Sequence, residues 1–208
     1  MENVLTIDPK NPDALSIGRA ADIVRSGGVI AYPTETFYGL GADAMNGAAV
    51  GRIFAIKGRD FQKPLPVIIG RIEDLHLVAA SVPEKAPPLM EKFWPGALTL
   101  LFPSAPDIPP PLTAATGKIG VRLSSHPIAK ALCLTVGHPI TATSANMTGM
   151  KECTTAQEVY AALGNLVDAI VDGGPTPGGL GSTIVDVTTD PPQVLRQGLI
   201  RIDRSEID

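Results

Sequence analysis

The sequence predicts a single α/β domain with a twisted, mixed sheet of parallel and antiparallel strands and helices packed on it. Helix-like and strand-like patterns alternate early in the chain, whereas strand-like patterns cluster late. Twenty-one glycines and 20 prolines divide the chain into many short elements, with no linker or internal repeat between them. With 208 residues, 44% of them hydrophobic, the chain can bury a sizeable core without disulfides or metals.

The individual elements are predicted from cap residues, glycines and runs of apolar residues. Asn11 and Pro12 suit the start of a helix that Gly27 closes, and Asn46 suits the cap of a helix that ends near Lys57. Further helices are predicted at 83–93, 127–136 and 155–163. Strands are predicted at 28–32, 65–69, 97–102, 119–123, 140–143, 169–172, 183–187 and 193–196. The proline-rich stretch 103–111 is predicted to be a surface loop.

Charge and composition exclude several classes of protein. The net charge of −4 argues against non-specific binding to long nucleic acids, which requires a broad basic face, but leaves room for a local basic pocket. Two cysteines without paired spacing argue against a disulfide scaffold or a zinc ribbon. The N-terminus lacks the regions of a signal peptide and no apolar stretch is long enough to span a membrane, so we expect a cytoplasmic protein.

The segment 39–44 matches the dinucleotide-binding pattern G-x-G-x-x-A. That pattern requires a strand that runs directly into the glycines and a helix that begins from them. Here Pro33 and the segment 34–36 separate the predicted strand from the glycines. A backbone turn near a ligand is therefore favoured over a dinucleotide site.

Three cations fall within seven residues, at the end of a predicted helix and in the loop after it. They are Lys57, Arg59 and Lys63. Cations are favourable at any helix C-terminus, which is the structural reading. An arginine fork with lysine point charges also suits a phosphate or a carboxylate, so an anion site and a helix end remain equal alternatives.

Small polar residues follow two predicted strands. Ser144 and Asn146 come after the strand 140–143, and Thr34, Glu35 and Thr36 come after the strand 28–32. Hydroxyl and amide groups can bind a ligand without net charge, and strand ends are common binding positions in α/β sheets. Taken on its own, the first group is better explained as a Ser/Asn turn, and Glu35 is either a general base or a structural carboxylate.

Eight segments, taken together and in this order, resemble the YrdC/Sua5 family over nearly the whole chain. They are Pro33-Thr34-Glu35-Thr36 with Tyr38-Gly39-Leu40-Gly41; Lys57-x-Arg59 with Lys63-Pro64-Leu65; Phe93-Trp94-Pro95-Gly96; Val121-Arg122 with His126-Pro127-Ile128-Ala129; Ser144-x-Asn146; Asp172-Gly173-Gly174; Ser182-Thr183-Ile184; and Leu195-Arg196-x-Gly198. The resemblance implies a YrdC-like fold in one domain, 1–208, similar to short members that lack a C-terminal extension.

The resemblance also implies the reaction of an L-threonylcarbamoyladenylate synthase. L-Threonine and bicarbonate form an N-carboxy adduct, whose carboxylate attacks the α-phosphate of ATP. The products are threonylcarbamoyl-AMP and pyrophosphate, and Mg²⁺ is expected to bridge the phosphates. A separate transferase then passes the threonylcarbamoyl group to adenosine 37 of tRNA, and direct contact with tRNA stays open.

The family implies roles for individual residues. Lys57 and Arg59 are expected to be catalytic. The expected ATP-binding residues are Arg59, Lys63, Lys118, Ser144, Asn146 and Arg196. The expected L-threonine-binding residues are Thr34, Thr36, Arg122, Ala142 through its backbone, and Ser182. No protein ligand for a metal is expected.

The chain departs from the family at three positions, and two other functions remain open. Asp60 stands where the family often has proline, Ile68 where longer members have histidine, and Glu152 where some members have serine. One alternative is a non-catalytic module that binds structured RNA, and the other is a related carbamoyl-adenylate-forming enzyme. The glycine-rich stretch 173–181 suits a flexible lid or a rigid turn equally well.

Overall fold

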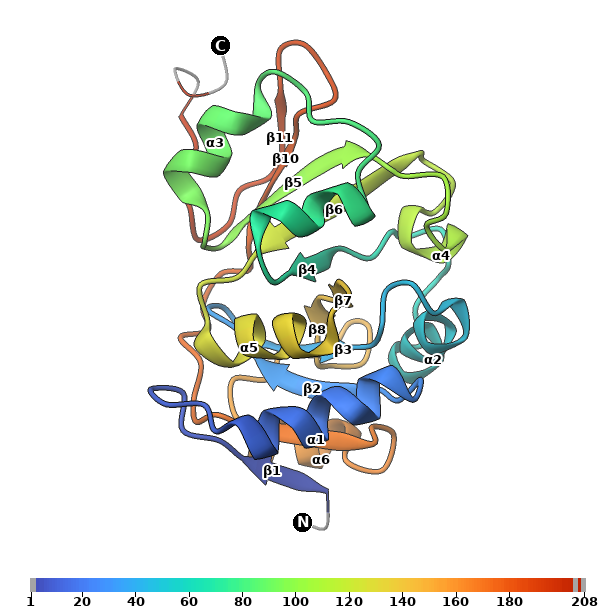
Figure 1. Cartoon of the computed structure of the whole chain (residues 1–208), viewed down its shortest axis with the longest axis vertical. Helices are drawn as coiled ribbons and strands as arrows, with labels where there is room; N and C mark the ends of the chain where they lie inside the picture. Colours follow the sequence, from blue (N-terminus) through green and yellow to red (C-terminus); the bar gives the residue numbers. More distant parts are fainter. Residues whose placement is uncertain (1–2, 204–205, 207–208) are drawn as a thin grey trace.

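The strands of the computed structural model form two mixed sheets, one above the other in Figure 1. The structure describes residues 3–203 and residue 206, so the ends of the predicted domain, 1–2, 204–205 and 207–208, lie outside it. The lower sheet has the order β1 (Val4–Thr6), β9 (Ala169–Asp172), β2 (Ile30–Pro33), β3 (Tyr38–Gly41), β8 (Thr143–Ser144). The upper sheet has the order β11 (Gln193–Arg196), β10 (Thr183–Asp186), β5 (Leu98–Pro103), β6 (Lys118–Leu123), β4 (Val67–Ile69), β7 (Ile140–Thr141). The predicted mixed α/β class is confirmed, with the strands divided between two sheets.

Two consecutive short strands join the sheets. β7 pairs with β4 in the upper sheet, and β8 pairs with β3 in the lower sheet. Ala142 lies between them, and its N–H donates to the carbonyl of Pro66 at 2.9 Å. The chain therefore crosses from one sheet to the other at Ala142, which places the residues around it where loops from both sheets meet.

Helices cover the sheets. They are α1 (Ala14–Arg25), α2 (Gly47–Lys57), the 3₁₀ helix η1 (Ile72–Leu77), α3 (Ala86–Phe93), α4 (Pro110–Thr113), α5 (Pro127–Val136) and α6 (Ala156–Leu163). In Figure 1, α1 crosses in front of the lower sheet and α5 lies above it, at the level where the sheets meet. Within the residues that the structure describes, no helix has both the length and the apolar character needed to cross a membrane.

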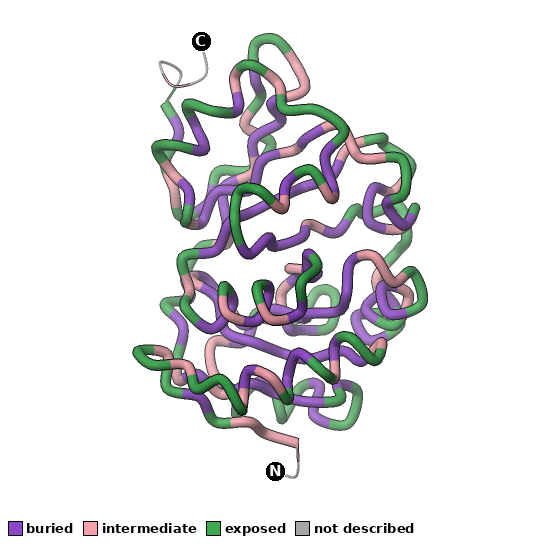
Figure 2. Tube along the Cα trace, in the orientation of Figure 1, coloured by how far each residue is buried: buried purple, intermediate pink, exposed green. Residues whose placement is uncertain are grey.

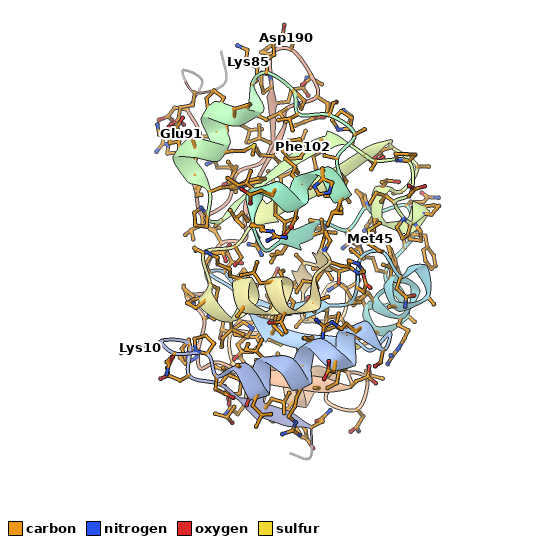
Figure 3. All side chains as sticks on the ribbon, viewed as in Figure 1. Lys10, Met45, Lys85, Glu91, Phe102 and Asp190 are labelled. Carbon is orange, nitrogen blue, oxygen red and sulfur yellow. The ribbon has the colours of Figure 1, made fainter. Side chains whose placement is uncertain are left out.

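Two hydrophobic clusters hold these layers together. The larger cluster includes β-strand residues from both sheets and reaches α2, α3 and α6. Phe102 belongs to it and is labelled within the upper half in Figure 3. The smaller cluster packs α1 and α5 against β2 and β9. Figure 2 shows buried positions along the central strands of both sheets, so burial of apolar side chains, at roughly 1.5–3 kcal/mol each, fixes the layers that frame the junction.

The start of α1 corrects one prediction. Asp13, not Asn11, caps the helix, and its carboxylate accepts a hydrogen bond from the N–H of Ser16 at 2.8 Å. Asn11 and Pro12 precede the cap, since the helix begins only at Ala14. The start of α2 is as predicted, because the Asn46 side chain accepts from the N–H groups of the second and third helical residues.

The glycines of segment 39–44 correct a second prediction. They lie in strand β3, which is buried and antiparallel to β2, so the predicted turn is wrong. A Cβ on Gly41 would lie 2.8 Å from the ring of Tyr32, which explains the glycine by close packing. No helix begins from these glycines, in agreement with rejection of a dinucleotide fingerprint. The predicted loop 103–111 also differs at its end, where α4 begins at Pro110.

Replacing Asn46 with alanine is expected to destabilise the protein by about 1 kcal/mol, because two N–H groups of α2 lose their acceptor. Thermal unfolding followed by circular dichroism should show a midpoint lower by about 2–4 °C. Asn46→Asp keeps a side-chain oxygen at the same place and is expected to retain wild-type stability. Equal losses in both variants would contradict this role for the cap.

Candidate active site

A cavity of about 440 Å³ opens where the two sheets meet. Loops from both sheets line it: the segment after β2, the loop after α2, the β7–β8 junction and the stretch 179–182. Strands β6 and β11 complete the wall. The predicted site residues that line it are Thr34, Thr36, Arg59, Arg122, Ala142, Ser144, Ser182 and Arg196. Three arginines far apart in the sequence therefore share one cavity.

Arg59 reaches the cavity from the end of α2. Gly58 takes a left-handed conformation with φ of +57°, which ends the helix and turns the chain. The Arg59 guanidinium donates to the carbonyls of Lys63 and Pro64, at 3.3 and 2.9 Å. These bonds use two of its five N–H groups and hold its plane, so the others remain for an anion.

Arg122 lies in β6 and is almost completely buried. Its Nη1 is 2.9 Å from Oε1 of Glu35, and Oε2 of Glu35 accepts a hydrogen bond from the hydroxyl of Ser124. Oε1 accepts no well-aligned hydrogen bond from the described residues, so the contact with Arg122 is mainly electrostatic. Glu35 is not part of the cavity wall, and its position fits the structural reading, in which it fixes the arginine behind the site.

Arg196 holds Ser182 at the cavity wall. Its guanidinium donates twice to the carbonyl of Ser182, at 3.0 and 2.8 Å, and once to the hydroxyl at 3.1 Å. Gly198 makes this approach feasible, since a Cβ there would lie 2.3 Å from the carbonyl oxygen of Gly181. Partial burial and the neighbouring charge of Arg122 lower the pKa of Arg196, which stays cationic near neutral pH.

Lys57 does not line the cavity. It is buried, and its ammonium donates to the carbonyl of Ser144 at 2.6 Å, the carbonyl of Asn146 at 2.7 Å and the side-chain oxygen of Asn146 at 3.0 Å. Burial, reinforced by the charge of Arg59, lowers the pKa of Lys57 to about 8. All three protons of the ammonium are used, so Lys57 organises the loop that presents Ser144.

Two other predicted cations and Asn146 also lie outside the wall. Lys118 pairs with Asp186 at 2.7 Å, and Lys63 is exposed on the loop that Arg59 braces. Asn146 is buried, where it accepts from Lys57 and from the hydroxyl of Ser144. The assignment of Lys63, Lys118 and Asn146 to ATP binding stays a prediction. Of the predicted ATP-binding residues, Arg59, Ser144 and Arg196 line the cavity together.

Several residues of the wall were not predicted as site residues, among them Phe37, Glu152, Leu180 and Gln197. Glu152 was noted only as a departure from the family, and no local pattern marks it. The other departures lie elsewhere, since Ile68 is buried in the smaller cluster and Asp60 caps a surface turn by accepting from the N–H of Gln62.

The stretch 173–181 borders the cavity and is hydrogen-bonded to neighbouring segments at several positions. The N–H of Gly178 donates to Thr36 at 2.8 Å, and the N–H of Thr176 donates to Thr154 at 2.8 Å. The hydroxyl of Tyr38 donates to the carbonyl of Gly174 at 2.8 Å. The bond from Gly178 couples the glycine-rich stretch to Thr36, which is predicted to contact the amino acid.

Comparisons with known proteins show the family of this chain. The family model Sua5_yciO_yrdC, described as telomere recombination, matches residues 22–198. The chain is 44% identical over 191 residues to the threonylcarbamoyl-AMP synthase of Bacillus subtilis (strain 168), with 91% of this chain and 55% of that protein covered. It is 39% identical over 186 residues to the threonylcarbamoyl-AMP synthase of Vibrio cholerae, with 88% and 97% covered.

A solved structure is similar along nearly the whole chain. The crystal structure of P. abyssi Sua5 complexed with L-threonine superimposes with a TM-score of 0.91 at 38% identity, covering 94% of this chain and 57% of that one. The chain thus spans about half the length of this structure and of the Bacillus relative. Because the family model matches most of the chain, and relatives above 30% identity match it almost end to end, the chain belongs to the Sua5/YciO/YrdC family.

Proposed function

We propose that this chain joins L-threonine, bicarbonate and ATP into L-threonylcarbamoyladenylate and releases pyrophosphate. The observation that carries the proposal is the convergence of Arg59, Arg122 and Arg196 on one cavity, which threonine and serine residues also line. Both reactants are anions, so they approach each other only where fixed positive charges reduce their repulsion. Relatives named threonylcarbamoyl-AMP synthase support the same reaction.

The amino acid would occupy the side of the cavity near Arg122. The guanidinium of Arg122, held by Glu35, would bind the threonine carboxylate, and the hydroxyls of Thr34, Thr36 and Ser182 with the backbone at Ala142 would hold its remaining polar groups. All of these residues line the cavity except Glu35, which lies outside its wall. The P. abyssi Sua5 crystallised with L-threonine supports an amino-acid site in this fold.

The nucleotide would occupy the side near Arg59. Arg59 and Arg196 would meet phosphate oxygens, Ser144 and Asn146 would hold the nucleotide, and Lys63 and Lys118 would add positive field. Lys57 would act by fixing the Ser144 loop. The carbamate carboxylate forms a bond to the α-phosphorus, and the bond to the leaving pyrophosphate breaks, so no covalent enzyme intermediate is required.

Mg²⁺ fits this site only together with the substrate. The described residues contain no group of three or more histidine, cysteine, aspartate or glutamate side chains that could cage a metal alone. Glu152 supplies one carboxylate on the wall, and Mg²⁺ is commonly held by one or two carboxylates plus substrate phosphates. When bound, the ion would neutralise phosphate charge.

The test is the dependence of ATP turnover on the other two substrates. Pyrophosphate release is expected only when L-threonine and bicarbonate are both present, and mass spectrometry should detect threonylcarbamoyl-AMP. ATP turnover that does not depend on threonine would contradict the proposal. Tight, salt-sensitive RNA binding without ATP, with no turnover, would favour the RNA-binding alternative.

We further propose that the product serves a separate transferase acting on adenosine 37 of tRNA, in the cytoplasm, where ATP, bicarbonate and threonine are available. A mixed anhydride of a carbamate and a phosphate is reactive toward amines, which supports immediate transfer. Adding a transferase and tRNA to the reaction is expected to give modified tRNA, whereas omitting this chain should abolish it.

A further inference from the structure

Glu152 is an acidic residue in a cavity built for anions. It lines the same wall as Arg59, Ser144 and Arg196, and it is the single carboxylate among the lining residues. Its side chain is exposed and makes no hydrogen bond or ion pair with any residue that the structure describes. A free carboxylate beside the proposed triphosphate position raises the repulsion that the arginines lower, unless a cation lies between them.

The loop holds Glu152 in a defined place. On one side the Asn146 amide donates to the carbonyl of Met150, and on the other the N–H of Tyr38 donates to the carbonyl of Cys153 at 3.0 Å. Asn146 is itself fixed by Lys57. Burial lowers the pKa of both Lys57 and Arg196, and the negative charge of Glu152 opposes part of that lowering, which places Glu152 within electrostatic reach of both cations.

We propose that Glu152 is the protein ligand of the Mg²⁺ ion that ATP carries into the site. The inference rests on the proposed function, because it requires the triphosphate beside Arg59 and Arg196. Mg²⁺ is a hard cation that prefers oxygen ligands, and one carboxylate with phosphate oxygens and waters completes its shell. Bridged in this way, the carboxylate anchors the phosphates that it otherwise repels.

The proposal predicts effects of opposite sign on two forms of ATP. In Glu152→Gln, metal-free ATP is expected to bind more tightly, since a repelling charge is gone, while MgATP is expected to bind more weakly, since a metal ligand is gone. The gain in ATP affinity on adding Mg²⁺ should therefore fall by roughly tenfold or more. Isothermal titration calorimetry in Mg²⁺ and in EDTA measures both affinities without turnover.

Two controls separate coordination from charge. Asp60→Asn removes a negative charge next to Arg59 but outside the cavity wall, and Glu91→Gln makes a similar chemical change on the outer edge of α3, labelled in Figure 3. Both are expected to keep the wild-type ratio of MgATP to ATP affinity. Mn²⁺ in place of Mg²⁺ gives a second readout, since the electron paramagnetic resonance signal of bound Mn²⁺ with ATP should weaken in Glu152→Gln alone.

The outcomes distinguish this inference from the proposed function. If ATP binds to the wild type but Glu152→Gln changes the affinities for MgATP and for metal-free ATP by the same factor, the metal assignment is wrong. Glu152 then only reduces the positive electrostatic potential of the cavity. If the wild type binds neither form of ATP, the nucleotide site and the metal assignment both fall. Circular dichroism of each variant checks that the fold is retained.

Discussion

Replacing Arg59 with alanine is expected to lower kcat/KM for threonylcarbamoyl-AMP synthesis by a factor of about 100 to 1,000, as for loss of one preorganised donor at a reacting phosphate. The reason is position: Arg59 lines the cavity and is braced by the carbonyls of Lys63 and Pro64. Arg59 is only partly buried and lies at the cavity wall outside the core, so the free energy of unfolding should change by less than about 1 kcal/mol. Pyrophosphate release and urea unfolding measure the two effects.

The matched control is Arg52→Ala, on α2, the helix that Arg59 follows. Arg52 pairs with Asp168 at 2.9 Å, is 44% exposed and does not line the cavity, so activity should stay at the wild-type level. Arg59→Lys keeps the charge but loses the planar fork, and intermediate activity is expected. An Arg59→Ala protein that unfolds yet keeps full specific activity would show that Arg59 is misplaced.

Replacing Lys57 with methionine is expected to destabilise the protein by about 2–4 kcal/mol, because buried carbonyl groups lose their donor. The acceptors left behind are the carbonyls of Ser144 and Asn146 and the Asn146 amide oxygen. The loop that presents Ser144 to the cavity should loosen, so synthesis is expected to fail as well. Urea unfolding is the measurement, and Lys130→Met, at an exposed position on α5, is the control.

The lowered pKa of Lys57 gives this comparison a defined pH dependence. Its pKa is about 8 in the folded chain against an ordinary value of 10.5, so in this interval the folded state has released a proton that the unfolded state retains. Stability from this group therefore rises with pH between about 8 and 10.5. The stability gap between wild type and Lys57→Met should widen from about pH 7 to about pH 9.5, and a gap that narrows would contradict the assigned pKa.

Helix ends were predicted well where they depend on cap residues and glycines, because these act on the backbone within a few residues. Asn46 caps α2, and the helix ends at Lys57 before a left-handed Gly58, as expected. The first helix shows the limit, since Asn11 and Asp13 are both good cap residues and only packing of α1 selected Asp13. The segment 39–41 was missed as a strand because its glycines are rare in strands, and the ring of Tyr32 that requires them lies on a neighbouring strand.

The sequence by itself determined the fold class, most element boundaries and, through the order of its motifs, the family. It also identified a set of cationic and hydroxyl side chains, some of which line the cavity. Only the tertiary structure decided which of them face the cavity. Arg59 reaches the wall, whereas Lys57, two residues earlier, is buried under the Ser144 loop. Strand pairing and packing set the direction of each side chain, and these contacts join residues far apart in the chain, as Glu35 does with Arg122.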